Sequence, residues 1–353
     1  MPTSPPVFDG HNDVVQHLLE YREGGRDFLL RNPEGHLDLP RAREGGLIGG
    51  LFALMALPPR PPEDDLTITS SGYEVRLAPP LDPGGARAQV LAQLAALEHL
   101  ERRAEGQLRI VRTSEQLAAL DADGPLGMVV HLEGADAIDA DFALLYDLHA
   151  RGLRSLGLVW SRPNRFGHGV PFAYPRSPDT GPGLTPDGKA LVRACNRLGV
   201  MIDVSHLNER GFWDVARLSD APLVATHSNA HAVCPSTRNL TDDQLGAVRE
   251  SEGVVGFNFA VNDVRPDAHL DPDTNVEVLV RHVDYLLSRL GVDGVALGSD
   301  FDGAVMPRAV ADASHLPTLL NALRTFGYDE DTLGKLASGN WRRVLRRTWR
   351  DEA

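Results

Sequence analysis

The sequence predicts an α/β fold: a TIM-like (β/α)8 barrel, residues 1–353 as a single domain, with a metal site at the C-terminal ends of the strands. Eight short apolar runs alternate with helical patterns along the chain, and five of the runs end at residues that can bind metal or carry protons. Strands that alternate with helices form right-handed βαβ units and a parallel sheet. A closed barrel gathers all its strand ends around one mouth, where a catalytic site would form.

The predicted strands are short and rich in Val, Leu, Ile and Gly, as expected of strands buried on both faces. They lie near residues 7–10, 50–57, 127–132, 154–160, 200–205, 222–227, 253–259 and 294–299. Helical patterns lie near residues 86–105, 114–120, 140–151, 186–198, 208–218, 241–250, 275–290, 313–326 and 329–348. The turn after the first strand is His11-Asn12-Asp13. An open doubly wound sheet would more often carry a glycine-rich phosphate turn there, so a closed barrel is favoured.

Two stretches show no regular pattern. The segment from Pro58 to Pro83 is rich in proline, and the segment from Ser161 to Pro186 is rich in Gly, Pro, Arg and aromatic residues. Each follows a predicted strand, so each is expected at the barrel mouth, the first as a cover or a subunit contact and the second facing the substrate. A surface loop without a role is the alternative for the first segment.

Composition and net charge disfavour several kinds of binding partner. With 49 acidic and 35 basic residues the net charge is −14, which disfavours a nucleic-acid or anionic-membrane partner. The two cysteines, Cys195 and Cys234, predict no disulfide framework. The first residues lack a signal-peptide pattern, and no apolar stretch approaches the roughly 18 residues that a membrane span needs. The expected location is therefore the cytoplasm.

His11 and Asp13 are two residues apart at the end of the first strand. In an extended segment such residues point to the same side, so one imidazole and one carboxylate could reach a single ion. Glu133 directly follows an apolar run, where a buried carboxylate is costly unless it is paired or bound to metal. Its two oxygens allow it to bridge two ions. A surface turn is the alternative for His11 and Asp13.

His206 and His227 end two further strands. Each alone could be an ordinary hydrogen-bonded histidine. Together with the first three residues they complete a ligand set for two ions, and imidazole with carboxylate suits Zn²⁺ or a similar divalent ion. A water or hydroxide would complete the bridge, and the ions would acidify it and polarise a carbonyl oxygen. The two lysines, Lys189 and Lys335, lie in helical stretches, which favours Glu133 over a carboxylated lysine as the bridge.

Asp300 ends the last strand, where it could act as general base and then general acid beside the ions. A helix N-cap or turn aspartate is the alternative, and it fits Asp302 better. Arg238 lies eleven residues after His227. Its guanidinium could hold a substrate carboxylate through two parallel hydrogen bonds. A surface salt bridge is the alternative for Arg238.

Taken together, these motifs resemble the renal, or membrane, dipeptidase family of two-zinc peptidases. The matching stretches are Asp9-Gly10-His11-Asn12-Asp13, His36-Leu37-Asp38-Leu39-Pro40, Glu133-Gly134, Asp203-Val204-Ser205-His206, Thr226-His227-Ser228-Asn229-Ala230, Arg238-Asn239-Leu240-Thr241-Asp242-Asp243, Gly298-Ser299-Asp300-Phe301-Asp302-Gly303 and Gly339-Asn340-Trp341-Arg342-Arg343-Val344-Leu345. They cover nearly the whole chain. Any one is weak, but so many in order are specific.

The resemblance implies a barrel that hydrolyses dipeptides, tolerates a D residue at the C-terminus, and could form a homodimer. It implies the following roles: one zinc on His11 and Asp13, the other on His206 and His227, Glu133 as the bridge, Asp300 as the proton carrier and Arg238 as the carboxylate anchor. The animal members carry a substrate-contacting histidine after the fourth strand, and this chain has Trp160 there. Trp160 is therefore a candidate substrate contact that changes how the oxyanion is held. The animal members are also secreted and lipid-anchored, which nothing in this sequence predicts.

Two other functions are compatible with these ligands. A two-metal amidohydrolase acting on another amide, lactam or ester would have the same set, although Arg238 favours a substrate with a free carboxylate. A barrel that has lost catalysis and only binds ligands is disfavoured because all five ligands and Asp300 are present.

Overall fold

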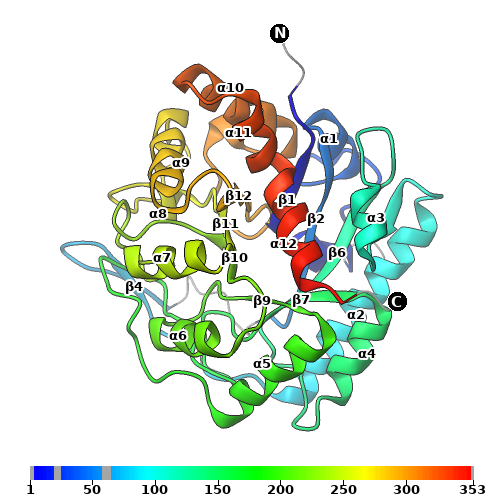
Figure 1. Ribbon diagram of the computed structural model, residues 1–353, viewed down its shortest axis with the longest axis vertical. Coiled ribbons are helices and arrows are strands. Elements are labelled where there is room, and N and C mark those ends of the chain that lie inside the picture. The colour runs from blue at the N-terminus through cyan, green and yellow to red at the C-terminus, as the bar shows by residue number, and fades with distance from the viewer. Residues whose placement is uncertain (1–3, 20–24, 58–64, 351–353) are drawn as a thin grey trace.

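The computed structural model describes residues 4–19, 25–57 and 65–350. Eight parallel strands follow one another in the order of the chain and form a nearly closed barrel surrounded by helices (Figure 1). The strands are β1 (Val7–Asn12), β2 (Leu47–Met55), β6 (Leu126–Glu133), β7 (Leu153–Gly157), β9 (Met201–Asp203), β10 (Val224–Ser228), β11 (Val254–Phe257) and β12 (Val295–Leu297). The predicted fold class, a TIM-like barrel, is confirmed.

The ring is joined between β1 and the segment that follows β12. The N–H of Asp300 donates to the carbonyl of His11 at 3.0 Å, and the N–H of Asp13 donates to the carbonyl of Phe301 at 2.8 Å. The buried carboxylate of Asp9 also accepts hydrogen bonds from the backbone N–H and the hydroxyl of Ser299, both at 2.8 Å. These contacts place the ends of the first and last strands next to each other.

The helices cover the outside of the barrel. They are α1 (Leu39–Glu44), α2 (Pro83–Arg103), α3 (Ser114–Ala118), α4 (Ala143–Arg151), α5 (Pro186–Leu198), α6 (Glu209–Leu218), α7 (Asp242–Glu250), α8 (Val261–Val264), α9 (Val276–Leu290), α10 (Leu316–Phe326), α11 (Glu330–Gly334) and α12 (Asn340–Thr348). Several begin at a side-chain cap, such as Thr185 for α5 and Asn208 for α6, which satisfies a backbone N–H of the first turn. A five-residue π-helix, Lys335–Gly339, separates α11 from α12, where the sequence predicted one continuous helix.

One end of the barrel is filled by side chains. Trp341, at the start of α12, is fully buried and donates from its Nε1 to the carbonyl of Leu297 at 2.8 Å. It belongs to a buried apolar cluster with side chains from the strands, among them Phe8, Leu51 and Val129. The open mouth is therefore at the other end, where the strands have their C-termini.

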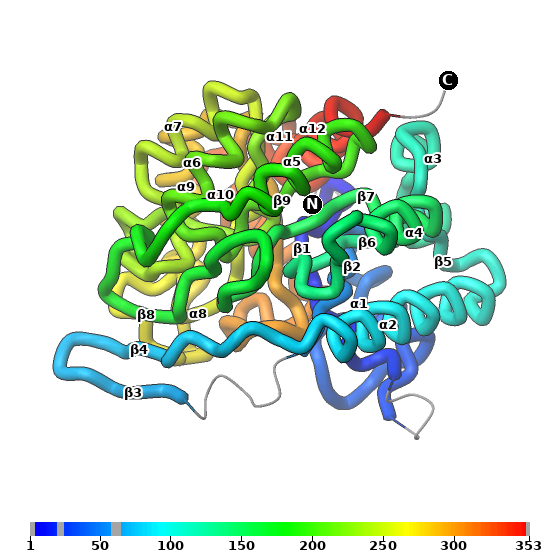
Figure 2. Tube along the Cα trace, turned by 90° about the horizontal axis from the view of Figure 1, so that it is seen from below, coloured from blue at the N-terminus to red at the C-terminus, as the bar shows by residue number. Residues whose placement is uncertain are grey.

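The two irregular stretches meet at that mouth. They supply β3 (Leu66–Ile68), β4 (Tyr73–Val75) and β8 (Ala173–Tyr174), which form a small antiparallel sheet in the order β3-β4-β8. Figure 2 shows the β3–β4 hairpin and α12 at opposite sides of the molecule. The prediction that residues 58–83 and 161–186 lie at the mouth is confirmed for the residues that form this sheet, while residues 58–64 lie outside the described part of the chain.

Candidate metal centre

Five side chains predicted as ligands converge at the mouth. His11 is in β1 and Asp13 follows it, Glu133 is the last residue of β6, His206 follows β9, and His227 is in β10. All five are buried, with exposed fractions of 5% or less. Four different strands therefore deliver these side chains to one place, as the strand-end argument predicted.

Glu133 stands between two groups of ligand atoms. Its Oε2 is 3.7 Å from Nε2 of His11, which in turn is 3.7 Å from Oδ2 of Asp13. Its Oε1 is 3.0 Å from Nε2 of His206 and 3.5 Å from Nε2 of His227. One carboxylate oxygen thus faces each group, which is the arrangement that a carboxylate bridging two ions requires.

The unpaired atoms of the centre fit divalent ions. Both ring nitrogens of His11 are buried without a hydrogen-bond partner, which is unfavourable unless another ligand is present. The Nε2 atoms of His206 and His227 are 3.0 Å apart, so both could bind one ion at the usual Zn–N distance of about 2.0–2.1 Å. The residues present therefore fit two ions with Glu133 between them.

A hydrogen-bond chain behind His227 sets the proton on its ring. The hydroxyl of Thr226 donates to the carboxylate of Asp203 at 2.6 Å and also lies 2.8 Å from Nδ1 of His227. Because a hydroxyl has one proton, it must accept at the second contact, so Nδ1 of His227 carries the hydrogen and Nε2 carries a free lone pair. His206 has a similar partner, since its Nδ1 lies 2.8 Å from the hydroxyl of Ser161.

Burial and neighbouring charges shift the pKa values of four groups of the centre, Glu133, His11, His206 and His227. Burial raises the pKa of Glu133 to about 8. Burial lowers the pKa of His11, but the carboxylates of Glu133 and Asp13 outweigh it and bring that pKa to about 10. Burial, together with nearby cations, holds the pKa values of His206 and His227 well below the usual value. Divalent ions bind such side chains in their deprotonated forms, so metal binding here would release protons.

Asp300 lies beside both groups of ligand atoms. A carboxylate oxygen of Asp300 and ring nitrogens of His11 and His227 all lie within 4.8 Å of one another. Its Oδ2 accepts from Nδ2 of Asn258 at 3.0 Å. Burial raises its pKa to about 6, which suits a group that takes up and releases a proton near neutrality.

Asp302 has the structural role that the sequence favoured. Its carboxylate accepts two hydrogen bonds from Arg26, both at 3.0 Å, and one from the backbone N–H of His36 at 2.9 Å. Both Asp300 and Asp302 have positive φ, at 64° and 68°. The loop after β12 is therefore strained and fixed by contacts with the segment around residues 26–36.

Arg238 is buried at the mouth, with an exposed fraction of 4%. One nitrogen, Nη2, donates to the carbonyl of His227 at 3.1 Å. No carboxylate among the described residues forms an ion pair with it, so a surface salt bridge is the wrong interpretation. Trp160 lies three residues beyond β7, which ends at Gly157 rather than at 160, and its ring centre is 5.9 Å from that of His206.

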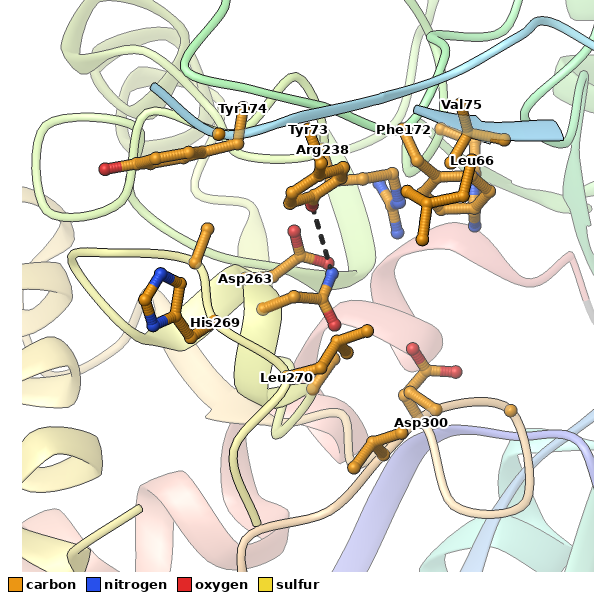
Figure 3. A pocket seen from close by; sticks show the side chains of 18 of the residues that line it. Leu66, Tyr73, Val75, Phe172, Tyr174, Arg238, Asp263, His269, Leu270 and Asp300 are labelled. Atoms are coloured by element: carbon orange, nitrogen blue, oxygen red, sulfur yellow. Dashed lines mark hydrogen bonds between the residues drawn. The ribbon is translucent and has the colours of Figure 1, made fainter. Parts of the chain in front are cut away.

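A cavity of about 1160 Å³ opens above the centre (Figure 3). Its lining includes Glu133, His206, Asp300, Arg238 and Trp160. Three of the predicted ligands, the predicted proton carrier and the predicted substrate contacts thus meet at one space that a small molecule can enter.

Contributors that were not predicted include Asn258, Thr226 and Asp203. Asn258 follows β11 directly, and Asp203 and Thr226 belong to β9 and β10. The signal that identified the ligands, a polar residue at the end of a buried strand, would also have found these three. They were missed because they contact ligands or Asp300 rather than the cavity.

A family model, "Membrane dipeptidase (Peptidase family M19)", matches residues 2–352. The chain belongs to this family. It is therefore a metal-dependent dipeptidase by family, and the resemblance seen in the sequence is confirmed. None of the helices in the described part of the chain is long and apolar enough to cross a membrane.

Solved structures and a curated relative agree with this membership. The metallo peptidase from Rhodobacter sphaeroides, liganded with a phosphinate mimic of the dipeptide L-Ala-D-Ala, is 48% identical, with a TM-score of 0.93 and coverage of 98% of this chain and 100% of that chain. A structure described as dipeptidase AC of family M19 is 50% identical, with a TM-score of 0.94 over 98% of this chain and 99% of the other. An uncharacterised protein from the pqqA 5′ region of Klebsiella pneumoniae is 48% identical over 76% of this chain and 98% of its own length.

Proposed function

We propose that this family member is a dizinc dipeptidase. His11 and Asp13 would hold one ion, His206 and His227 the other, and Glu133 would bridge them. The observation that carries the proposal is the position of Glu133, with one oxygen 3.7 Å from His11 and the other 3.0 Å from His206. Two ions held in this way would acidify a water that serves as the nucleophile and would polarise the substrate carbonyl.

The chain's own residues complete the chemistry. Asp300 takes the proton from the attacking water and passes it to the leaving amine, since one of its oxygens is held by Asn258 and its pKa is raised to about 6 by burial. Arg238 binds the terminal carboxylate of the dipeptide, because its guanidinium has no carboxylate partner among the described residues and faces the cavity (Figure 3). Trp160 contacts the substrate beside His206.

We further propose that dipeptides with a D residue at the C-terminus are cleaved. The scissile carbonyl and the terminal carboxylate are fixed at two points, and the large cavity leaves room for the C-terminal side chain on either side of its Cα. The phosphinate ligand of the Rhodobacter sphaeroides enzyme mimics L-Ala-D-Ala, which supports the same stereochemistry here. The N-terminal residue is expected to be L, because its Cα adjoins the attacked carbonyl inside the barrel rim.

The test is kcat/KM for the four stereoisomers of Ala-Ala and for L-Ala-L-alaninamide, with the metal content of the same sample. We expect L-L and L-D cleavage, and rates at least about 10² lower for an N-terminal D residue, because a steric clash of a few kcal/mol suffices. The amide should be a poor substrate. Absence of hydrolysis for every isomer would contradict a dipeptidase, whereas strict L-L activity would contradict only the D tolerance.

We also propose that the protein acts in the cytoplasm. Cys195 and Cys234 are both free and buried, as is usual for a reducing compartment. Fractionation of cells that express the natural protein tests this, and recovery outside the cytoplasm would contradict it.

A further inference from the structure

One face of the small sheet over the mouth is entirely apolar or aromatic. Register pairs Leu66 with Val75, Ile68 with Tyr73 and Tyr73 with Tyr174, and side chains that are paired across strands lie on the same face. Phe172 is two residues before Tyr174 and shares that face. We call this set the apolar roof: Leu66, Ile68, Tyr73, Val75, Phe172 and Tyr174.

The apolar roof faces the cavity. All six of its side chains line the cavity, and Figure 3 shows Leu66, Tyr73 and Phe172 on the side of the sheet where Arg238 lies. The residues that alternate with them, Thr67, Glu74 and Ala173, do not line it, and Glu74 forms an ion pair with Arg176 instead. The sheet is therefore amphipathic, with its apolar side turned inward.

The apolar roof is incompletely covered. Leu66 is 38% exposed and Ile68 is 74% exposed although both face the cavity. Across the cavity, Leu270 and Val305 are also exposed, at 59% and 41%. Apolar surface gathered around one cavity marks a place where an apolar ligand group is bound. The cavity, at about 1160 Å³, also exceeds the range of about 300–1,000 Å³ that is usual for small-molecule sites, and it is larger than a dipeptide with small side chains needs.

The apolar roof is attached to the segment that carries Arg238. The N–H of Thr237 donates to the carbonyl of Ala173 at 3.0 Å, and the N–H of Ala173 donates to the hydroxyl of Thr237 at 3.2 Å. A substrate carboxylate on Arg238 therefore lies next to β8. The C-terminal residue of the dipeptide, which carries that carboxylate, then has its side chain beneath the apolar roof.

We propose that the apolar roof selects dipeptides whose C-terminal residue has a large apolar or aromatic side chain. This inference rests on the proposed function and names its substrate class. The six roof side chains offer no charged partner, so a charged C-terminal side chain would lose hydration there without compensation. Two acidic side chains, Asp263 and Asp267, line the cavity elsewhere. Asp263 accepts a hydrogen bond from the hydroxyl of Ser236 at 2.7 Å, and Asp267 is paired with Arg265 at 2.7 Å.

The first test compares five dipeptides: L-Ala-Ala, L-Ala-Phe, L-Ala-Asp, L-Ala-Lys and L-Phe-Ala. In each, the C-terminal residue has the configuration, L or D, that the enzyme cleaves faster. We expect kcat/KM for L-Ala-Phe to exceed that for L-Ala-Ala about tenfold or more, with Asp and Lys at or below Ala. Equal rates for Ala, Phe and Lys would overturn the proposal, as would a preference confined to L-Phe-Ala. Failure to cleave any dipeptide would instead overturn the proposed function.

The second test uses two matched variants. Leu66→Ser removes an apolar side chain from the roof, while Leu77→Ser makes the same change at an equally exposed residue, also 38%, that does not line the cavity. Leu66→Ser should lower kcat/KM for L-Ala-Phe about 3- to 10-fold and lower kcat/KM for L-Ala-Ala by a smaller factor, and Leu77→Ser should change neither. Equal losses on both substrates, or no loss on L-Ala-Phe, would contradict selection by the apolar roof.

Discussion

His227 can bind an ion only through a nitrogen that lacks a proton. The chain from Asp203 through Thr226 places the proton on Nδ1, away from the centre, and so keeps Nε2 free. Such partners fix the orientation and tautomer of metal-binding histidines in general. Thr226 is therefore a positioning residue, although it touches neither substrate nor the cavity.

Two substitutions of Thr226 distinguish the effect of its hydroxyl from the effect of its branched shape. Thr226→Val keeps the branched side chain but leaves the N–H at Nδ1 of His227 without a hydrogen-bond acceptor. We therefore expect one of the two ions to bind about 10- to 100-fold more weakly. Thr226→Ser retains the hydroxyl and should bind both ions nearly as the natural protein does. Zinc affinity measured by competition with a chelator decides between these outcomes. Equal affinity in both variants would show that the tautomer is set elsewhere.

Asp300 is predicted to carry a proton rather than to hold the ions. Asp300→Asn keeps the shape of the side chain and its place beside Asn258, but the amide cannot transfer the proton. We expect both ions to remain and kcat to fall by about 10²–10⁴, the usual size of a general acid–base contribution. Turnover at the natural rate, with two ions confirmed by elemental analysis, would assign the proton transfer to another group.

At the scale of elements, the loop after β12 holds Asp300 and approaches Asp13 closely. A Cβ added at Gly303 would overlap Oδ2 of Asp13 and Oδ1 of Asp300. Gly303→Ala should therefore displace both carboxylates, with a loss of zinc occupancy and an activity at least about tenfold lower. The control is Gly246→Ala in α7, where a Cβ meets no atom within 4 Å and the substitution should be neutral or slightly stabilising. Normal zinc content and activity in Gly303→Ala would show that the loop can move aside.

The sequence predicted the strand ends well because parallel strands in a barrel all finish at one mouth, so polar residues after apolar runs must meet. Short elements were harder to predict. The three residues of β5 (Leu108–Ile110), Leu-Arg-Ile, are too few for a pattern, and α1 and α8 have six and four residues. The hairpin β3–β4 was predicted only as an irregular cover. Its apolar side chains face a cavity that other parts of the chain form, and the local sequence does not reveal that cavity.

At the scale of the whole molecule, buried histidines make stability depend on pH. His282 in α9 is fully buried and accepts the N–H of Ala230 at 2.8 Å through Nε2, and burial lowers its pKa to about 4. Its pKa in the unfolded chain is near 6.5, so below that pH the unfolded state gains a proton that the folded state refuses. Its contribution is complete above pH 6.5 and declines as the pH falls toward 4, by roughly 3 kcal/mol in total.

Replacing His282 with glutamine removes its titratable group and so isolates its contribution to the pH dependence of stability. Between pH 7 and pH 4 the free energy of unfolding of His282→Gln should fall less than that of the natural protein, by roughly 3 kcal/mol. Denaturant unfolding of both proteins across this range supplies the measurement. A difference between the two that does not change with pH would mean that His282 does not stay neutral in the folded state.

The ligands come from both halves of the chain, so a centre for two ions requires the complete barrel. Elemental analysis, combined with titration of Zn²⁺ into metal-free protein, tests this most directly. We expect about two ions per chain and activity that reaches its maximum at two equivalents. His206→Asn should retain about one ion and lose most activity, because a missing ligand opens one of the two sites. Full activity in protein that holds one ion or none would contradict Glu133 as a bridge between two metals.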